Sequence, residues 1–176
     1  PAPARRRAPP LMARRAMQVV VWLIVAAVAV LVAARLGAFS GRAPSNLGVR
    51  EGKLKPPSRT PNSVSSQADL WPDAPQKDSA HIAPIALVGG DGKATIARIA
   101  QVVEGLPGAK IVERRDDYLY AQFTTAVMRF VDDVEFWFDP AVGAVQVRSA
   151  SRVGSSDLGV NRARIENIRA RLGTAG

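Results

Sequence analysis

The chain has 176 residues, enough for one domain with appended segments, and its composition of 47% apolar and 22% charged residues is that of a folded protein. It contains no cysteine, which excludes disulfides, thiol catalysis, cysteine-ligated zinc and an N-terminal lipid-modified cysteine. The formal net charge of +9 resides almost entirely in residues 1–50, which hold eight arginines and no acidic residue. A nucleic-acid-binding domain carries its basic excess on the folded part, so we expect no nucleic-acid partner. The arginines instead indicate membrane orientation.

Residues 17–36 are predicted to form a single transmembrane helix. The run from Met17 to Ala34 carries no charge, and as a helix it spans about 27 Å, close to the hydrocarbon thickness of a bilayer. Residues 1–16 are predicted to be a basic cytoplasmic tail, because positive charge stays on the cytoplasmic side. We therefore expect a bacterial inner-membrane protein that contacts the lipid bilayer through residues 17–36 and has a periplasmic C-terminal domain.

A cleaved signal peptide is the alternative for the same segment. Arg14 and Arg15 precede the apolar run, and small residues follow Leu36 where a peptidase could cut. The apolar run is longer than the usual signal core, which favours a retained anchor.

Prolines and polar residues dominate the chain after the apolar run. Residues 37–60 are predicted to be a proline-rich linker that acts as an extended tether, and residues 61–176 a periplasmic-type globular domain. Within that domain, apolar residues such as Trp71 and Ile82 would be costly in water, so residues 61–92 are expected to lie across the folded part as an arm.

Regular elements are predicted from residue 95 onward. Ile96, Ile99 and Val103 share one helix face, with Asp91 as a candidate N-cap. The same spacing predicts a C-terminal helix with apolar residues at 165, 168 and 172. Between the helices, runs rich in β-branched and aromatic residues predict strands at 110–114, 118–124, 127–131, 134–139 and 144–151.

This order predicts the α+β class, with an antiparallel β-meander of about four to five strands and two helices packed on one face. The proline and glycine of residues 139–143 form a tight turn that makes residues 131–139 and 144–152 hairpin partners.

Three segments resemble a known family. They are residues 61–66 (PNSVSS), 130–135 (FVDDVE) and 147–162 (VRSASRVGSSDLGVNR). Together they resemble the domain-of-unknown-function family 1499, found in bacteria and photosynthetic eukaryotes, over roughly residues 58–173.

The resemblance implies no activity, since the family has none assigned. Two positions depart from the family pattern. Ser63 stands where members often have cysteine, and Ser155 stands where they often have tyrosine. The first departure removes any thiol chemistry from this chain.

Asp132, Asp133 and Glu135 form the densest group of carboxylates. In a strand, Asp133 and Glu135 share one face and Asp132 points to the other. The favoured interpretation is structural ion pairing of the three carboxylates with Arg148 and Arg152 on the neighbouring strand. Divalent-cation binding and acid–base catalysis are the alternatives.

A second polar group precedes the C-terminal helix, where free backbone N–H groups could hold an anion. Its ordinary alternative is a capped helix whose loop is tied down by Arg–Asp pairs and by the side chain of Asn161. The candidate ligand-binding residues are Arg148, Ser149, Arg152, Ser156, Asp157 and Arg162.

The sequence favours a non-enzymatic, membrane-tethered module that binds a protein partner in the envelope, as an accessory subunit of a membrane complex. Trp137 is the candidate partner surface, because it alternates with two phenylalanines along one strand. The alternative is a small anionic-ligand binder or hydrolase that uses the arginine-lined loop. His81 is the single histidine and is expected to pack on the arm, and no metal and no cofactor are expected.

Overall fold

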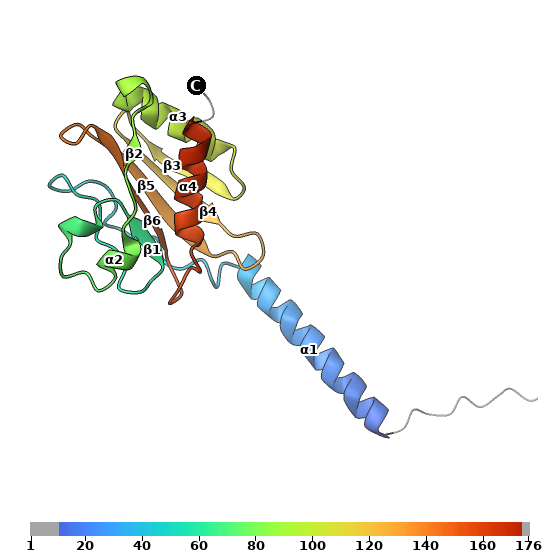
Figure 1. Cartoon of the computed structure of the whole chain (residues 1–176). Coiled ribbons are helices and arrows are strands. Elements are labelled where there is room, and N and C mark those ends of the chain that lie inside the picture. Colours follow the sequence, from blue (N-terminus) through green and yellow to red (C-terminus); the bar gives the residue numbers. More distant parts are fainter. Residues whose placement is uncertain (1–10, 174–176) are drawn as a thin grey trace, which may run out of the picture.

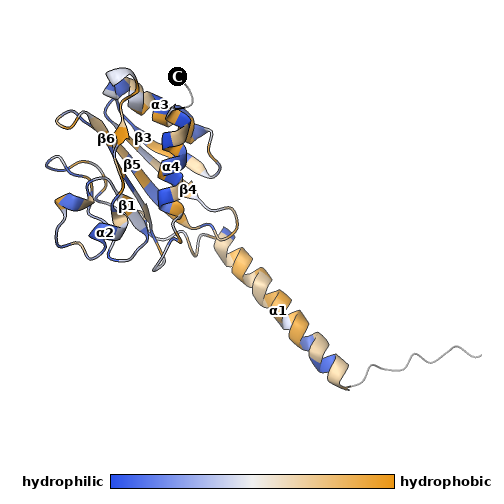
Figure 2. Ribbon diagram, viewed as in Figure 1, coloured by the Kyte–Doolittle hydropathy of each residue, from blue (hydrophilic) through white to orange (hydrophobic). Residues whose placement is uncertain are grey.

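The computed structural model describes residues 11–173, and its first element is a long helix that projects from a globular domain (Figure 1). Helix α1 (Leu11–Arg35) is long and apolar enough to cross a membrane, and its surface is hydrophobic over most of its length (Figure 2). The helix begins earlier than the predicted residue 17, so Arg14 and Arg15 are helical. Residues 1–10 of the predicted basic tail lie outside the described residues.

The domain is α+β, which confirms the predicted fold class, and its sheet has six antiparallel strands. The order is β1-β6-β5-β4-β3, and β2 also pairs with β6. The predicted meander is β3 to β6, and the two additional strands come from the predicted arm. The strands are β1 (Ser63–Ser65), β2 (Ile85–Ala86), β3 (Ala109–Arg114), β4 (Tyr118–Thr124), β5 (Val131–Asp139) and β6 (Ala144–Ser151).

Two helices cover one face of the sheet, as predicted (Figure 1). They are α3 (Gly92–Glu104) and α4 (Val160–Gly173), and their apolar stripes pack on the inward side chains of β4, β5 and β6. Asp91 caps α3 by accepting a hydrogen bond from the backbone N–H of Ala94, 3.0 Å away. The remaining helical elements are short: η1 (Ala68–Leu70), α2 (Lys77–Ala80) and η2 (Val88–Gly90).

The predicted strand at residues 127–131 is wrong. Residues 126–128 form a turn, and β5 begins at Val131. The loop is closed by hydrogen bonds between Thr125 and Phe130, and Arg129 adopts a left-handed backbone conformation with φ of 59°. The β4–β5 hairpin requires the chain to reverse here, and this requirement decides the conformation despite the strand propensity of the valines in the run.

The other face of the sheet is covered by residues 42–60. Leu54 is buried against Tyr118, Tyr120 and Trp137, and its backbone N–H donates to the Gln67 side chain. The segment predicted to be an extended tether is thus packed on the sheet, because its apolar side chains would otherwise stay in water. Trp137 is only 9% exposed beneath this segment, so the predicted partner surface is covered.

Candidate anion-binding site

Alternation along β5 and β6 places charged side chains on the sheet face opposite the helices. Asp133 and Glu135 point to this outer face, and Glu135 lies opposite Arg148 in the β5–β6 register. Asp132 points to the helix face, where it meets α4. The predicted division of the three carboxylates between two faces is therefore present.

Asp133 and Arg152 form a two-point ion pair. Nε and Nη2 of Arg152 donate to the two carboxylate oxygens of Asp133, at 2.8 and 2.7 Å. The Tyr120 hydroxyl also donates to Asp133. Two parallel charge-assisted hydrogen bonds fix the plane of the guanidinium group. The side chain of Arg152 is therefore held in one orientation on the outer face.

Glu135 and Arg148 are both buried, and they are paired more loosely. Arg148 Nη1 lies 3.8 Å from Glu135 Oε2, which accepts no hydrogen bond from the residues that the structure describes. Glu135 Oε1 accepts from the Gly48 backbone N–H at 2.7 Å and from the Tyr118 hydroxyl at 2.8 Å. Burial raises the pKa of Glu135 and lowers the pKa of Arg148. Removal from water therefore disfavours the charged forms of both side chains.

Asp132 pairs with Arg164 of α4, which corrects the expectation that it pairs with Arg148 or Arg152. The Arg164 guanidinium lies 4.6 Å from the centroid of the Phe123 ring. This pair was not predicted from the sequence, although the opposite orientation of Asp132 indicates that its cation comes from the helix that covers that face.

The residues predicted to form a site before α4 are divided between two places. Ser156, Asp157 and Arg162 line a cavity of about 190 Å³ at the start of α4, whereas Arg148 and Arg152 lie on the outer face of the sheet. Arg162 Nη2 donates to the backbone carbonyls of Ser79 and His81, at 3.1 and 2.7 Å, and so ties α4 to the arm. Ser149 faces the helices and donates to Asn161, away from Arg148. His81 is largely exposed and its Nδ1 lies 3.1 Å from Asp69.

Ser156 and Asp157 act as caps in the loop before α4. The Ser156 hydroxyl accepts from the Leu158 N–H, and the Asp157 carboxylate accepts from the N–H groups of Gly159 and Asn161. These contacts therefore favour the interpretation of this loop as a helix cap over its interpretation as a ligand-binding loop.

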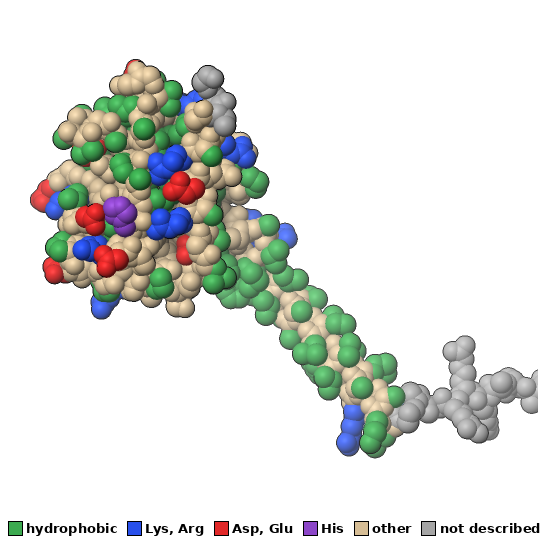
Figure 3. Space-filling view, in the orientation of Figure 1, with side chains coloured by type: hydrophobic (Ala, Val, Ile, Leu, Met, Phe, Trp, Pro, Cys, Tyr) green, Lys and Arg blue, Asp and Glu red, His purple; other side chains and the backbone are tan. Residues whose placement is uncertain are grey.

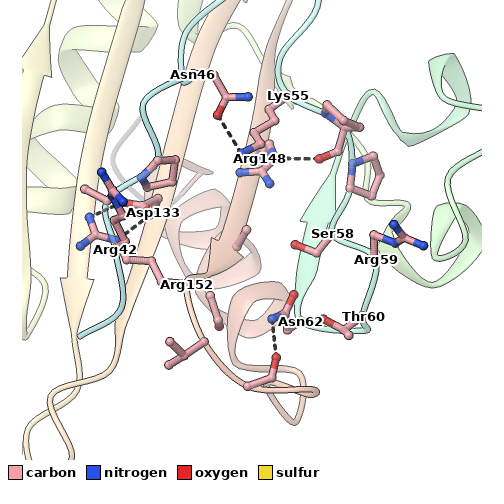
Figure 4. A pocket seen from close by; sticks show the side chains of 18 of the residues that line it. Arg42, Asn46, Lys55, Ser58, Arg59, Thr60, Asn62, Asp133, Arg148 and Arg152 are labelled. Atoms are coloured by element: carbon pink, nitrogen blue, oxygen red, sulfur yellow. Dashed lines mark hydrogen bonds and ion pairs between the residues drawn. The ribbon is translucent and has the colours of Figure 1, made fainter. Parts of the chain in front are cut away.

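A cavity of about 750 Å³ lies on the outer face instead, between residues 42–62 and the end of β6 (Figure 4). Arg148 and Arg152 line it, as does Asp133. Three further cations that were not predicted as site residues also line it: Arg42, Lys55 and Arg59. In the sequence these cations stand among the prolines of residues 37–60, the segment that was predicted to be a linker.

Lys55 is held in place at the cavity. Its Nζ donates to Asn46 Oδ1 at 2.8 Å (Figure 4). Burial, followed by the charge of Arg148, lowers the pKa of Lys55. The charges of Glu135 and Asp133 act on this pKa in the opposite direction, and the net effect is a lowering.

Arg148 has hydrogen-bonding capacity left. It is 4% exposed, and its Nε donates to the Pro56 carbonyl at 3.2 Å. Neither Nη atom forms a hydrogen bond with a residue of the described range 11–173. Nη1 faces the Glu135 carboxylate at 3.8 Å without a hydrogen bond, so this nearly buried guanidinium retains donors that an anion in the cavity could use.

Metal binding is not supported on this face. Within residues 11–173, no group of three or more histidine or carboxylate residues could hold a metal ion. Asp133 and Glu135 are instead engaged with arginines and tyrosines.

Comparisons with known proteins give one match. The model of the family described as "Protein of unknown function (DUF1499)" matches residues 53–172. No curated protein and no solved structure matches the chain. The matched range covers the sheet, both covering helices and most of the cavity lining, including Arg148 and Arg152. The chain therefore belongs to the DUF1499 family.

Proposed function

We propose that this protein is a membrane-anchored, periplasmic binding domain that takes a small anionic ligand, with phosphate or carboxylate groups, in the outer-face cavity. One observation carries the proposal: Arg148 is nearly buried at the cavity, and its Nη donors have no hydrogen-bond partner in residues 11–173.

The charge balance of the cavity supports an anion. Five cationic side chains line it; Arg152 is paired with Asp133 and Arg148 faces Glu135, which leaves Arg42, Lys55 and Arg59 without a carboxylate partner among the described residues. Arg42 and Arg59 are exposed and form no ion pair with a described residue, so their charges remain available to a ligand. An anion would relieve the mutual repulsion of these cations.

The location rests on α1 and on the arginines around it. The length and apolar character of α1 support a retained helix that crosses the inner membrane, and with the basic segment in the cytoplasm the domain and its cavity would face the periplasm. The alternative of an accessory subunit bound through Trp137 is weaker, because that side chain is covered by residues 42–60. We therefore assign ligand binding, and not partner docking, to this face.

The test compares thermal unfolding of the full-length protein in detergent with and without a probe anion. The probes are inorganic phosphate and citrate, each against chloride at equal ionic strength. A ligand present at ten times its dissociation constant stabilises the folded state by about 1.4 kcal/mol. We expect such a stabilisation of the wild-type protein.

The informative variant is Arg42→Ala/Arg59→Ala, which removes two exposed cations of the cavity without breaking an ion pair. The control is Lys110→Ala, which removes an exposed cation of β3, away from the cavity, that forms no ion pair with a described residue. Phosphate and citrate also stabilise proteins nonspecifically, and the control variant reports that part. We expect the stabilisation to fall in the cavity variant and to persist in the control. Equal responses of all three proteins would overturn the proposal.

A further inference from the structure

Exposed apolar side chains gather at the end of the domain from which α1 departs (Figure 3). Leu36 directly follows α1 and is 82% exposed, Val127 in the β4–β5 loop is 59% exposed, and Leu158 in the β6–α4 loop is 93% exposed. Phe130 is also exposed at the start of β5. Large apolar side chains left in water at one end of a domain mark a contact surface.

Contacts between segments place these residues at one end. The rings of Phe39 and Phe130 lie 5.9 Å apart, which joins the β4–β5 loop to the chain leaving α1. Gly41 lies so close to Arg152 and Val153 that a Cβ there would meet their side chains within 3 Å. The chain that leaves α1 is thus packed against both the β4–β5 loop and the end of β6. Figure 1 shows the β4–β5 loop beside the end of α1 and the loop that precedes α4 on the same lower side of the domain.

The two loops hold their residues in strained backbone conformations. Arg129 and Leu158 have positive φ angles of 59° and 52°, in the left-handed region that disfavours side chains other than glycine. The β6–α4 loop is fixed by hydrogen bonds from the N–H groups of Leu158 and Gly159 to Ser156 and Asp157. Leu158 is therefore presented to the outside by a built loop, and such strain is characteristic of functional positions.

We propose that this end of the domain rests on the outer surface of the bilayer. The contact surface, called here the apolar rim, consists of Leu36, Phe39, Val127, Phe130 and Leu158. The bilayer is the natural occupant because the rim lies at the point where α1 leaves the domain, so lipid around a membrane-crossing α1 would lie next to it.

Charge complementarity supports the same occupant. Arg35, Arg42 and Arg129 are exposed at this end, next to the rim, where the phosphate groups of lipids lie. Apolar side chains in the interface with arginines around them are the arrangement that binds peripheral proteins to anionic membranes. The rim thereby sets how the domain is oriented on the membrane, and with it where the mouth of the cavity faces.

The test uses the absence of cysteine in the chain. Single cysteines are introduced at Leu158 or Val127 in the full-length protein, labelled with an environment-sensitive fluorophore, and reconstituted in vesicles containing phosphatidylglycerol. The matched control is Val142→Cys, an exposed apolar position in the β5–β6 turn. Quenching is measured with lipids that carry a nitroxide just below the headgroup.

We expect a blue-shifted emission and a large loss of fluorescence at residues 158 and 127, and neither at residue 142. Emission at residues 158 and 127 equal to that at residue 142 would overturn the proposal. The inference rests on the anchoring part of the proposed function, and vesicle flotation separates the two: protein that floats with vesicles but shows no quenching fails at the rim alone. Anion binding in the cavity is measured in detergent and does not depend on this result.

Discussion

Asn161 is predicted to be the polar residue on which the packing of α4 depends most. It is fully buried in the first turn of α4. Its Oδ1 accepts from Ser149 and Arg164, while its Nδ2 donates to the Asn62 carbonyl at 3.0 Å and to the Ser151 hydroxyl at 3.1 Å. One side chain thus joins α4 to β6 and to the chain that enters β1.

The expected cost of Asn161→Ala follows from those four hydrogen bonds. Each contributes about 1 kcal/mol net, and a buried partner left unsatisfied costs about 1–3 kcal/mol. Part of the loss is compensated, because the Asn62 carbonyl also accepts from the Ser151 N–H and Arg164 keeps its bond to Asp132. We therefore expect the free energy of unfolding to fall by about 2–4 kcal/mol.

Urea unfolding of the full-length protein in detergent, followed by tryptophan fluorescence, measures this loss. The matched control is Asn167→Ala on the same helix, where the exposed side chain accepts from Arg171. A surface substitution of this kind is expected to stay within about 0.5 kcal/mol. The reasoning is refuted if Asn161→Ala costs no more than the control, since the network would then carry no net stability.

Two further predictions concern the outer face. In the folded state burial raises the pKa of Glu135 above its unfolded value, so the folded protein binds this proton more tightly and loses stability as pH rises through the acid range. The stability of the wild-type protein minus that of Glu135→Gln is therefore expected to fall with rising pH, by at most about 1.4 kcal/mol per pH unit in urea unfolding; a flat or rising difference contradicts it. For Arg152→Ala, which leaves the buried Asp133 carboxylate without its two-point partner, we expect a loss of about 3–5 kcal/mol in the same assay, and a loss under about 1 kcal/mol would show that the pair is not structural.

The sequence predicted the hairpin of β5 and β6 and the faces of its side chains. Strand alternation placed Asp133 and Glu135 together, and the turn at residues 139–143 supplied the register that brings them to Arg152 and Arg148. Such local rules act between neighbours in the chain, which is why they could be applied without a structure.

Contacts between distant segments could not be predicted in the same way. The pair of Asp132 with Arg164 depends on how α4 crosses the sheet, and helical spacing alone does not give that angle. The burial of Trp137 depends on residues 42–60, whose proline content was the stronger local signal than the apolar Leu54. The cavity was missed for the same reason, because half of its lining belongs to that segment.

The packing of residues 42–60 also connects α1 to the candidate site. Arg42 and Asn46 of the cavity lining lie only a few residues beyond the end of α1 and precede the residues that match the family model. Arg148 and Arg152 belong to β6 and the residues directly after it, within the matched range. The cavity therefore exists only while the chain that follows α1 is docked on the sheet, with Gly48 donating to Glu135 and Leu54 buried over Trp137. Undocking of this segment would expose the Glu135–Arg148 pair to water and open the cavity, so the packing of the sheet and the proposed ligand site depend on the same contacts.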